Sequence, residues 1–513
     1  MKAFWKYLLW LLSFFTLVTY YLFYTSLGEG TLRHFLGNYL SDKTGNHLEV
    51  NHLNLKNYPI VSMMVVINNG AEVTLKGTAN IREINMDYHL IGDTLHYNGI
   101  HLNEKMNITG NMSGTTSELL ITGKGEVFEG TTQFNFVKTP SYFKYTNINL
   151  KDVNAQKVLT FLHRRAVVKG KADIDANFKH YERYKKDGDV LIHMKRAFVP
   201  SLIGTVPFAL KTKIKFSDLE YFYDVGIKSK IGTCIVSDGY YHQSKKEAKA
   251  HYILDIKELA YFKKFFKHRF NGGFASSGTM TYRDKKILLT GTTKQFGGLA
   301  EYSYAQKTLK VNMEGISLVK ALKLFSYPTV LSSDIYGTVD FNLKDKMVFI
   351  NTRLKKTQFR KNKMTDTIFN STGIDVLKDV YNNSSFVGGY QNSVLHSTLI
   401  IDNGKKYLYL TNTRMNSKAN TIDSDFKLKI DGEEIYGEIY GTLKDPKFSI
   451  DVQKFIKRKL SKTLGKWGGT KKREAVARKI NAVKSDVSKK LEEIDVEKIK
   501  KKTKHFLNGF FEQ

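Results

Sequence analysis

The stretch that decides the fold is VTLKGTANIR, residues 73–82, in which apolar or small residues alternate without a break with polar ones. A period of two is typical of a β-strand that has one apolar face and one wet face. The same pattern recurs in KADIDANF (171–178), FKLKI (426–430) and IYGEIYGTL (435–443). Each of these stretches therefore predicts a half-buried strand.

Strand-like segments of this kind recur from Leu48 to Asp451, separated by short turn signals. Asp431-Gly432, between two of them, is a strong hairpin signal. Helical periodicity appears only in short inserts, so we predict a mainly β body over residues 48–451 that is built from one long antiparallel sheet.

The helical inserts repeat. Each runs from a strand through a short amphipathic helix into a strand that opens with a glycine, in segments 148–178, 252–282, 311–341 and, more weakly, 369–390. The glycines are Gly170, Gly278, Gly337 and Gly389. Their spacing predicts a repeating unit of about 55 residues, made of several strands and one helix. We expect the glycines to permit a bend or a bulge.

A sheet with one apolar face needs a cover for that face. A second sheet would make a sandwich; a sheet curled along its length would instead line a hydrophobic groove that the short helices cover only in part. The groove-lining candidates follow from the alternation: Val73, Leu75, Ala79, Ile81, Ala172, Ile174, Phe178, Phe426, Leu428, Ile430, Ile435, Ile439 and Leu443.

The N-terminus predicts a membrane anchor over residues 1–27. The run from Tyr7 to Tyr24 carries no charge and is near the lower limit for spanning a bilayer. Lys2 and Lys6 precede it, so we expect a cytoplasmic N-terminus and translocation of everything that follows. A cleaved signal peptide is the alternative. Residues 28–47 are expected to form an amphipathic helix beside the membrane.

The chain is strongly basic, with a net charge of +31. Such a charge favours an anionic partner, either nucleic acid or anionic lipid. Translocation argues against nucleic acid. From Lys454 to Lys504 there are 19 Lys and Arg residues against 6 Asp and Glu, so residues 452–513 are expected to form basic amphipathic helices that lie on a membrane or cap the open edge of the sheet. The membrane-surface candidates are Lys454, Phe455, Ile456, Lys457, Arg458, Lys459, Leu460 and Lys462.

Catalytic motifs are missing from the sequence: there is no zinc-protease, nucleophile-elbow, P-loop or dinucleotide-binding pattern in a fitting context. His89, His96 and His101 lie along strands without a matching acidic set, and Asp173 and Asp175 are expected to be solvated. Cys234 is the only cysteine and reads as a buried thiol. We expect no enzyme activity, no metal and no cofactor.

The order of elements resembles that of the AsmA-like family of repeating β-groove proteins. The resemblance rests on LRHFLGNYLSDKTGNHLEVNHLNLKNYP (32–59) after the anchor, on the repeated inserts, and on GTLKDPKFSID (441–451) at the end of the body. It implies an inner-membrane protein of a Gram-negative bacterium, with most of its chain in the periplasm. It also implies that phospholipid moves along the groove between the inner and outer membranes and that the protein contributes to outer-membrane lipid homeostasis.

Two other functions fit the same residues. Exposed edge strands could template nascent outer-membrane proteins, which would make the chain an assembly factor. A closed sandwich would make it a structural envelope protein. Phospholipid transport is the hypothesis that the alternation and the resemblance favour together.

Overall fold

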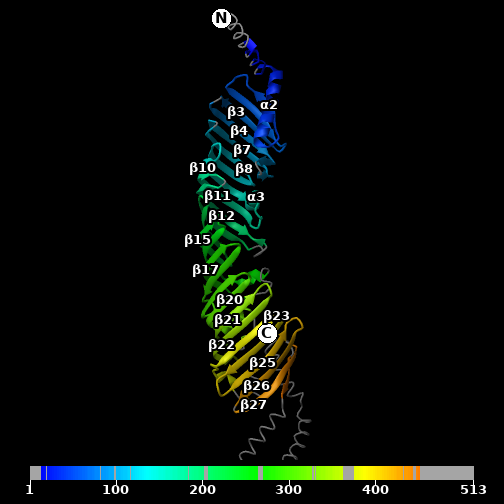
Figure 1. Cartoon of the computed structure of the whole chain (residues 1–513), viewed down its shortest axis with the longest axis vertical. Helices are drawn as coiled ribbons and strands as arrows, with labels where there is room; N and C mark the ends of the chain where they lie inside the picture. Colours follow the sequence, from blue (N-terminus) through cyan, green and yellow to red (C-terminus); the bar gives the residue numbers. More distant parts are fainter. Residues whose placement is uncertain are drawn as a thin grey trace, which may run out of the picture. The chain divides into compact units, whose positions relative to one another are not determined.

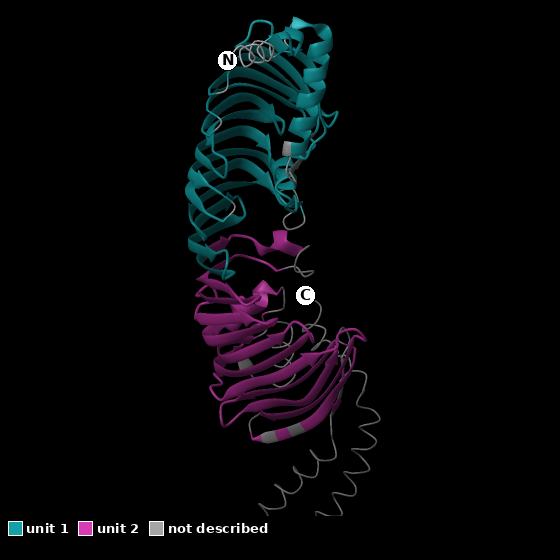
Figure 2. Ribbon diagram, turned by 45° about the horizontal axis from the view of Figure 1, so that its top comes forward, with its two compact units in different colours: residues 1–252 teal, residues 253–513 magenta. Residues whose placement is uncertain are grey.

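The computed structural model describes residues 13–450 apart from 15, 19, 23, 81, 98–99, 116, 183, 201–205, 264–269, 326–328, 330, 362–374, 431 and 443–445 (Figure 1). The chain divides into two compact units, residues 1–252 and 253–513. Both are mainly β, as the alternation predicts, and each is described by itself below (Figure 2).

Unit 1 begins with helix α2 (Ser26–Thr44) and continues almost entirely as strands. These are β1 (Leu48–Asn54), β2 (Ile60–Ile67), β3 (Ala71–Ala79), β4 (Ile84–Gly92), β5 (Leu95–Tyr97), β6 (Ile100–Leu102), β7 (Met106–Gly114), β8 (Leu119–Val127), β9 (Gly130–Lys138), β10 (Phe143–Asn154), β11 (Lys169–Tyr181), β12 (Lys186–Phe198), β13 (Phe208–Ser217), β14 (Glu220–Ser229) and β15 (Gly232–His242). Helix α3 (Ala155–Phe161) lies between β10 and β11, and β16 (Glu247–Ile256) contains the boundary between the units.

Unit 2 also consists mainly of strands. Its strands are β17 (Phe274–Arg283), β18 (Lys286–Thr293), β19 (Leu299–Ala305), β20 (Thr308–Ser317), β21 (Leu331–Asn342), β22 (Met347–Phe359), β23 (Ser384–Gln391), β24 (Val394–Asp402), β25 (Tyr407–Asn416), β26 (Thr421–Ile430), β27 (Glu433–Thr442) and β28 (Pro446–Ile450). The helices among its described residues are α6 (Leu318–Leu324) and two 3₁₀ turns, η1 (Leu259–Phe262) and η2 (Val376–Lys378).

Strand pairing is antiparallel throughout and follows chain order. In unit 1 the ladder runs from β1 to β4 and from β7 to β15, with β4 and β7 paired directly, while β5 and β6 form a small separate pair. In unit 2 it runs from β17 to β28. No pairing among the described residues joins the first strand of either ladder to its last, so neither sheet closes on itself. The hairpin predicted at Asp431-Gly432 joins β26 to β27, and Gly432 has a φ of +81°.

Hydrophobic side chains cluster beside helices, and the small β5–β6 sheet adds one residue, Leu102, to the edge of the cluster beside α3. In unit 1, Leu53 and Leu75 lie in one cluster, which Leu32 and Leu36 of α2 contact. A second cluster joins Val158 of α3 to β8 and β10–β13. In unit 2, Leu318 and Ala321 of α6 pack on a third cluster. The helices, together with Leu102 of β6, therefore cover parts of the apolar surface.

Helical turns occur in each of the four segments in which the sequence shows an insert. A left-handed residue, Asp152 (φ +52°) or Gly315 (φ +66°), bulges the strand just before the helix N-cap. The N-caps are Asn154 and Ser317, and each is followed by a helix of seven residues. Among the described residues, the second and fourth inserts contain the 3₁₀ turns η1 and η2.

The N-terminal prediction is described only in part. Helix α2 spans Ser26–Thr44, close to the helix expected over 28–47, and it ends at the left-handed Gly45. Among the described residues, no helix combines the length and apolar character needed to cross a bilayer. Residues 1–12, which hold much of the predicted anchor, lie outside the described part, as do residues 451–513 with every predicted membrane-surface residue of the tail.

Candidate functional site

The register gathers the apolar side chains of unit 1 on one face of its sheet, here called the apolar face. Residues directly opposite each other on neighbouring strands share a face. Leu75 of β3 lies opposite Met63 of β2 and Tyr88 of β4. Ile174 of β11 lies opposite Leu150 of β10 and Ile192 of β12. The face continues from strand to strand through the pairing register, which several β-bulges shift locally, as between Leu150 and Val153.

Most of this face is half-buried. Some buried positions lie in clusters that a helix contacts, as at Leu75 and Ala172, and others lie outside these clusters, as at Phe178, which packs on Tyr181 and Phe216. Elsewhere large apolar side chains keep intermediate exposure, and examples are Ile121, Phe134, Phe136, Ile148, Ile174, Val190, Ile192, Ile214, Val225 and Ile227. Partial exposure over many consecutive strands is what distinguishes this face from a closed core, in which most side chains lose nearly all contact with water.

The predicted groove residues of unit 1 lie together on this face. Val73, Leu75 and Ala79 point to it from β3, and Ala172, Ile174 and Phe178 do so from β11, by the register of their partners. Leu75, Ala172 and Phe178 are buried, while Val73, Ala79 and Ile174 are half-buried. Ile81 lies outside the described residues.

Unit 2 has an apolar face of its own. Leu428 of β26 lies opposite Leu408 of β25 and Ile435 of β27, and Phe426 lies opposite Leu410. Ile439 is buried, whereas Phe426 and Leu428 are half-buried. The backbone positions of Ile430 and Ile435 place them on the same face, and Leu443 lies outside the described residues.

Sequence reasoning missed many positions of the apolar faces. Met86, Tyr88, Ile192, Ile214 and Val339 lie on them without having been singled out. The signal was available, because INMDYHL (84–90) and KTKIKF (211–216) alternate with the same period of two. Applying the alternation to every strand would have found them.

Tyr88 illustrates how glycines shape the apolar face. Its hydroxyl donates a hydrogen bond to the Thr122 carbonyl oxygen at 3.0 Å, so the ring lies flat across β7 and β8. A Cβ atom at Gly110 or Gly123 would stand 2.6 or 2.4 Å from that hydroxyl. The two glycines therefore make the room that the ring occupies, and burial raises the pKa of Tyr88 to about 12.

The opposite face of the unit 1 sheet is polar. Asn111 donates from Nδ2 to Asp87 at 2.9 Å, and His89 contacts Asn107 at 2.8 Å. A shallow pocket of about 650 Å³ lies among these side chains and those of Thr74, Lys76, Thr109, Thr122, Lys124, Gln133, Asn135 and Asn147. The two faces of the sheet thus differ in chemistry, although exposed apolar side chains such as Leu191 and Phe222 also lie on the polar one.

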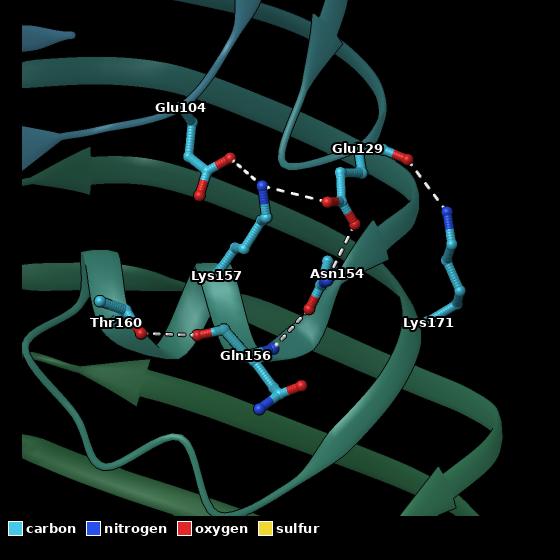
Figure 3. A network of polar contacts seen from close by, with 7 residues as sticks. All are labelled: Glu104, Glu129, Asn154, Gln156, Lys157, Thr160 and Lys171. Atoms are coloured by element: carbon cyan, nitrogen blue, oxygen red, sulfur yellow. Dashed lines mark hydrogen bonds and ion pairs between the residues drawn. The ribbon is translucent and has the colours of Figure 1, made fainter. Parts of the chain in front are cut away.

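Helix α3 is held in place by a polar network at one rim of the sheet (Figure 3). Lys157 contacts Glu104 and lies 3.1 Å from Glu129, and Asn154 donates to Glu129 at 2.9 Å. Lys171 donates to the Glu129 carbonyl oxygen at 3.0 Å. The hydrogen bond from Asn154, with help from Lys157, lowers the pKa of Glu129, and the hydrogen bond to Glu104 raises the pKa of Lys157.

Helix α2 covers the first edge of the unit 1 sheet. Arg33 donates from Nη1 to the Asn51 carbonyl oxygen at 2.8 Å, and the Leu48 N–H donates to Ser41 Oγ at 2.9 Å. These β1 groups would otherwise be free to pair with another strand. The edge is therefore partly closed to strand addition.

The described residues contain no group of three or more metal-ligating side chains. His96 and His101 face each other across the small β5–β6 pair. Cys234 is half-buried on β15, and burial raises the pKa of its thiol, which disfavours the reactive thiolate. Asp173 and Asp175 lie on the polar face of β11; Asp173 accepts a hydrogen bond from the Asp152 N–H at 3.0 Å, and Asp175 contacts Asn149.

Comparisons of the chain with protein-family models, with curated proteins and with solved structures found no match in any of the three. The functional argument therefore rests on the chain's own geometry.

Proposed function

We propose that this protein is an AsmA-like carrier that moves phospholipid along an apolar β-groove between the inner and outer membranes of a Gram-negative bacterium. One observation carries the proposal: the apolar faces extend over consecutive strands, and many of their large side chains remain half-buried. Acyl chains of phospholipid are the ligand that such a surface accommodates best, because they are apolar, long and tolerant of irregular walls.

In this proposal, lipid binds in the groove because its acyl chains replace water on the apolar side chains. Ile174, Ile192 and Ile214, on three neighbouring strands, would exchange water for acyl methylenes, each worth about 0.8 kcal/mol when buried. The headgroup would stay in water at the open side, so no binding pocket has to be specific for it. Because the wall is similar from strand to strand, a lipid can shift along it without a large barrier.

Membrane attachment belongs to the same proposal. Large apolar side chains among the described residues near the N-terminus are well exposed: Phe14 52%, Leu17 67%, Tyr20 60%, Tyr21 43% and Tyr24 54%. Exposed apolar residues in such density favour a lipid surrounding. Together with the uncharged run from Tyr7 they support an inner-membrane anchor, with the strands in the periplasm.

The assembly-factor hypothesis is less well supported. Strand addition needs a free edge, and α2 occupies backbone groups of β1 at the first edge of unit 1. The structural-protein hypothesis requires a sealed core, and the half-buried apolar faces argue against one.

Site-specific photo-crosslinking in cells tests the proposal. A photoreactive amino acid at Ile192, on the apolar face, is expected to give phospholipid adducts that mass spectrometry identifies. The matched control is the next residue, His193, which is exposed on the polar face of the same strand. Lipid adducts at both positions or at neither, or outer-membrane β-barrel proteins as the main adducts at Ile192, would overturn the proposal.

A further inference from the structure

A rim of unit 1 combines exposed cations with exposed apolar side chains. The segment LHRRAVVKGK, residues 162–171, leads from α3 into β11. Leu162 is 56% and Val167 is 52% exposed. Between and beyond them lie four exposed cations and no acidic residue: Arg164, Arg165, Lys169 and Lys171.

Strand pairing adds two further cations to this rim. Lys169 lies opposite Phe198, and Gly170 lies opposite Ala197. This register places Lys195 and Arg196, both exposed, beside the start of β11. Segment 162–171 together with Lys195 and Arg196 is called the basic rim below.

The cations of the basic rim lack direct ion pairs within the described part of unit 1, although the charge of Lys171 acts on the nearby Glu129 carboxylate. None of the six forms an ion pair with a carboxylate there: the contacts of Lys171 and Arg196 are with the Glu129 carbonyl oxygen at 3.0 Å and with the Phe198 ring at 5.6 Å. Like charges on neighbouring strands repel each other and destabilise the sheet. Their concentration at one rim is therefore explained most simply by an anionic partner.

The apolar residues decide the kind of partner. An acidic protein would pair with the cations but has no general need for two protruding aliphatic side chains. At a bilayer both features contribute, because Leu162 and Val167 can enter the boundary region while the arginines and lysines stay at the phosphates. Each cation near an anionic leaflet contributes on the order of 1 kcal/mol.

We propose that the basic rim docks on the surface of an anionic phospholipid bilayer. The contact is separate from the N-terminal anchor and from the basic C-terminal segment. Phe161 and Ile174, which belong to the apolar cluster beside α3, lie next to the rim. Docking there would bring the apolar face of unit 1 to a membrane surface.

A position-specific probe tests this in the full chain, where other segments also bind lipid. With the single cysteine replaced (Cys234→Ser), an environment-sensitive fluorophore is attached at Val167→Cys or, as a matched control, at Ser244→Cys in the exposed β15–β16 turn. Vesicles of neutral phospholipid, vesicles with about one third phosphatidylglycerol, and soluble polyglutamate are added in turn.

We expect the fluorescence emission of the probe at position 167 to shift to the blue when anionic vesicles are added. Neutral vesicles should cause no shift at position 167, and the probe at position 244 should not shift with either kind of vesicle. Arg164→Glu with Arg165→Glu should abolish the shift, whereas Lys185→Glu with Lys245→Glu, an equal charge change at exposed turns, should keep it. Three results would overturn the proposal: no shift at 167, a shift that survives the arginine reversal, or an equal shift with polyglutamate, which would indicate an acidic polymer as partner.

Discussion

Arg33 of helix α2 donates a hydrogen bond to the main-chain carbonyl oxygen of Asn51, in the first strand of unit 1, at 2.8 Å. Ser41, two turns further along the helix, accepts the N–H of Leu48 at 2.9 Å. The helix thus replaces a missing strand neighbour by side-chain contacts. This relationship protects the edge of a sheet that would otherwise offer its backbone to other chains.

Removing both contacts should expose that edge. We expect Arg33→Ala combined with Ser41→Ala to cost about 1–3 kcal/mol in local stability, the range for leaving such donors and acceptors unpaired. Hydrogen exchange at Leu48 should accelerate and the protein should associate at high concentration, as measured by light scattering. Asn38→Ala is the control, because Asn38 is an exposed residue of the same helix whose amide contacts only His34. Equal exchange rates in the two variants would contradict the prediction.

Glycine at position 337 should be irreplaceable, and glycine at 389 should not be. Gly337 has a φ of +145°, and a Cβ atom there would stand 2.1 Å from the Asn351 carbonyl oxygen. Gly389 has no heavy atom within 4 Å of the corresponding position. Gly337→Ala should therefore lower stability by about 1–3 kcal/mol, while Gly389→Ala should change it little. The measurement is the urea midpoint of each variant, and similar midpoints would show that the backbone bend is not under strain.

These two glycines also show what the sequence could and could not predict. Both follow a helical insert and look alike as letters, yet Gly337, like Gly170 (φ +130°), has the left-handed conformation and Gly389 does not. The difference depends on the partner strand, because the carbonyl of Asn351 approaches Gly337 only once β21 and β22 are in register. Local sequence contains no information about that approach.

The positions of the strands, and the face of the sheet to which each side chain points, were far easier to predict. The alternation in 73–82 and 171–178 depends only on local chemistry, and the register places its apolar members on one face. How far each side chain is buried was not predictable in the same way. Leu75 and Val73 have equal standing in the sequence, but Leu75 lies in a cluster that α2 contacts and is 9% exposed, whereas Val73 stays half-buried. Both side chains belong to the same cluster, so their burial depends on tertiary packing that the alternation does not encode.

The attachment of α3 should weaken in acid. Because the pKa of Glu129 is lowered in the folded chain, its contribution is complete above its ordinary value of 4.5 and is lost as the pH falls through the lowered pKa. Amides 155–161 should therefore exchange faster below about pH 4.5, after correction for the intrinsic rate. Lys157→Met should flatten this pH dependence. Lys151→Met, at an exposed position that lines one pocket together with Glu129 and Lys157, should leave it unchanged.

A charge placed on the apolar face should affect folding much less than it affects lipid binding. Ile192 is half-buried, so Ile192→Lys can extend its ammonium group toward water while its stem stays on the sheet. A charge held against hydrocarbon costs about 2–4 kcal/mol, and each 1.4 kcal/mol is tenfold in occupancy. Phospholipid crosslinking at Ile214, on the neighbouring strand, should then fall at least tenfold. His193→Lys places the same charge on the polar face of the same strand and should leave crosslinking at Ile214 unchanged. Circular dichroism melting of both variants separates loss of lipid from loss of fold. If the two lysine variants crosslink lipid equally while both stay folded, acyl chains do not travel along this face.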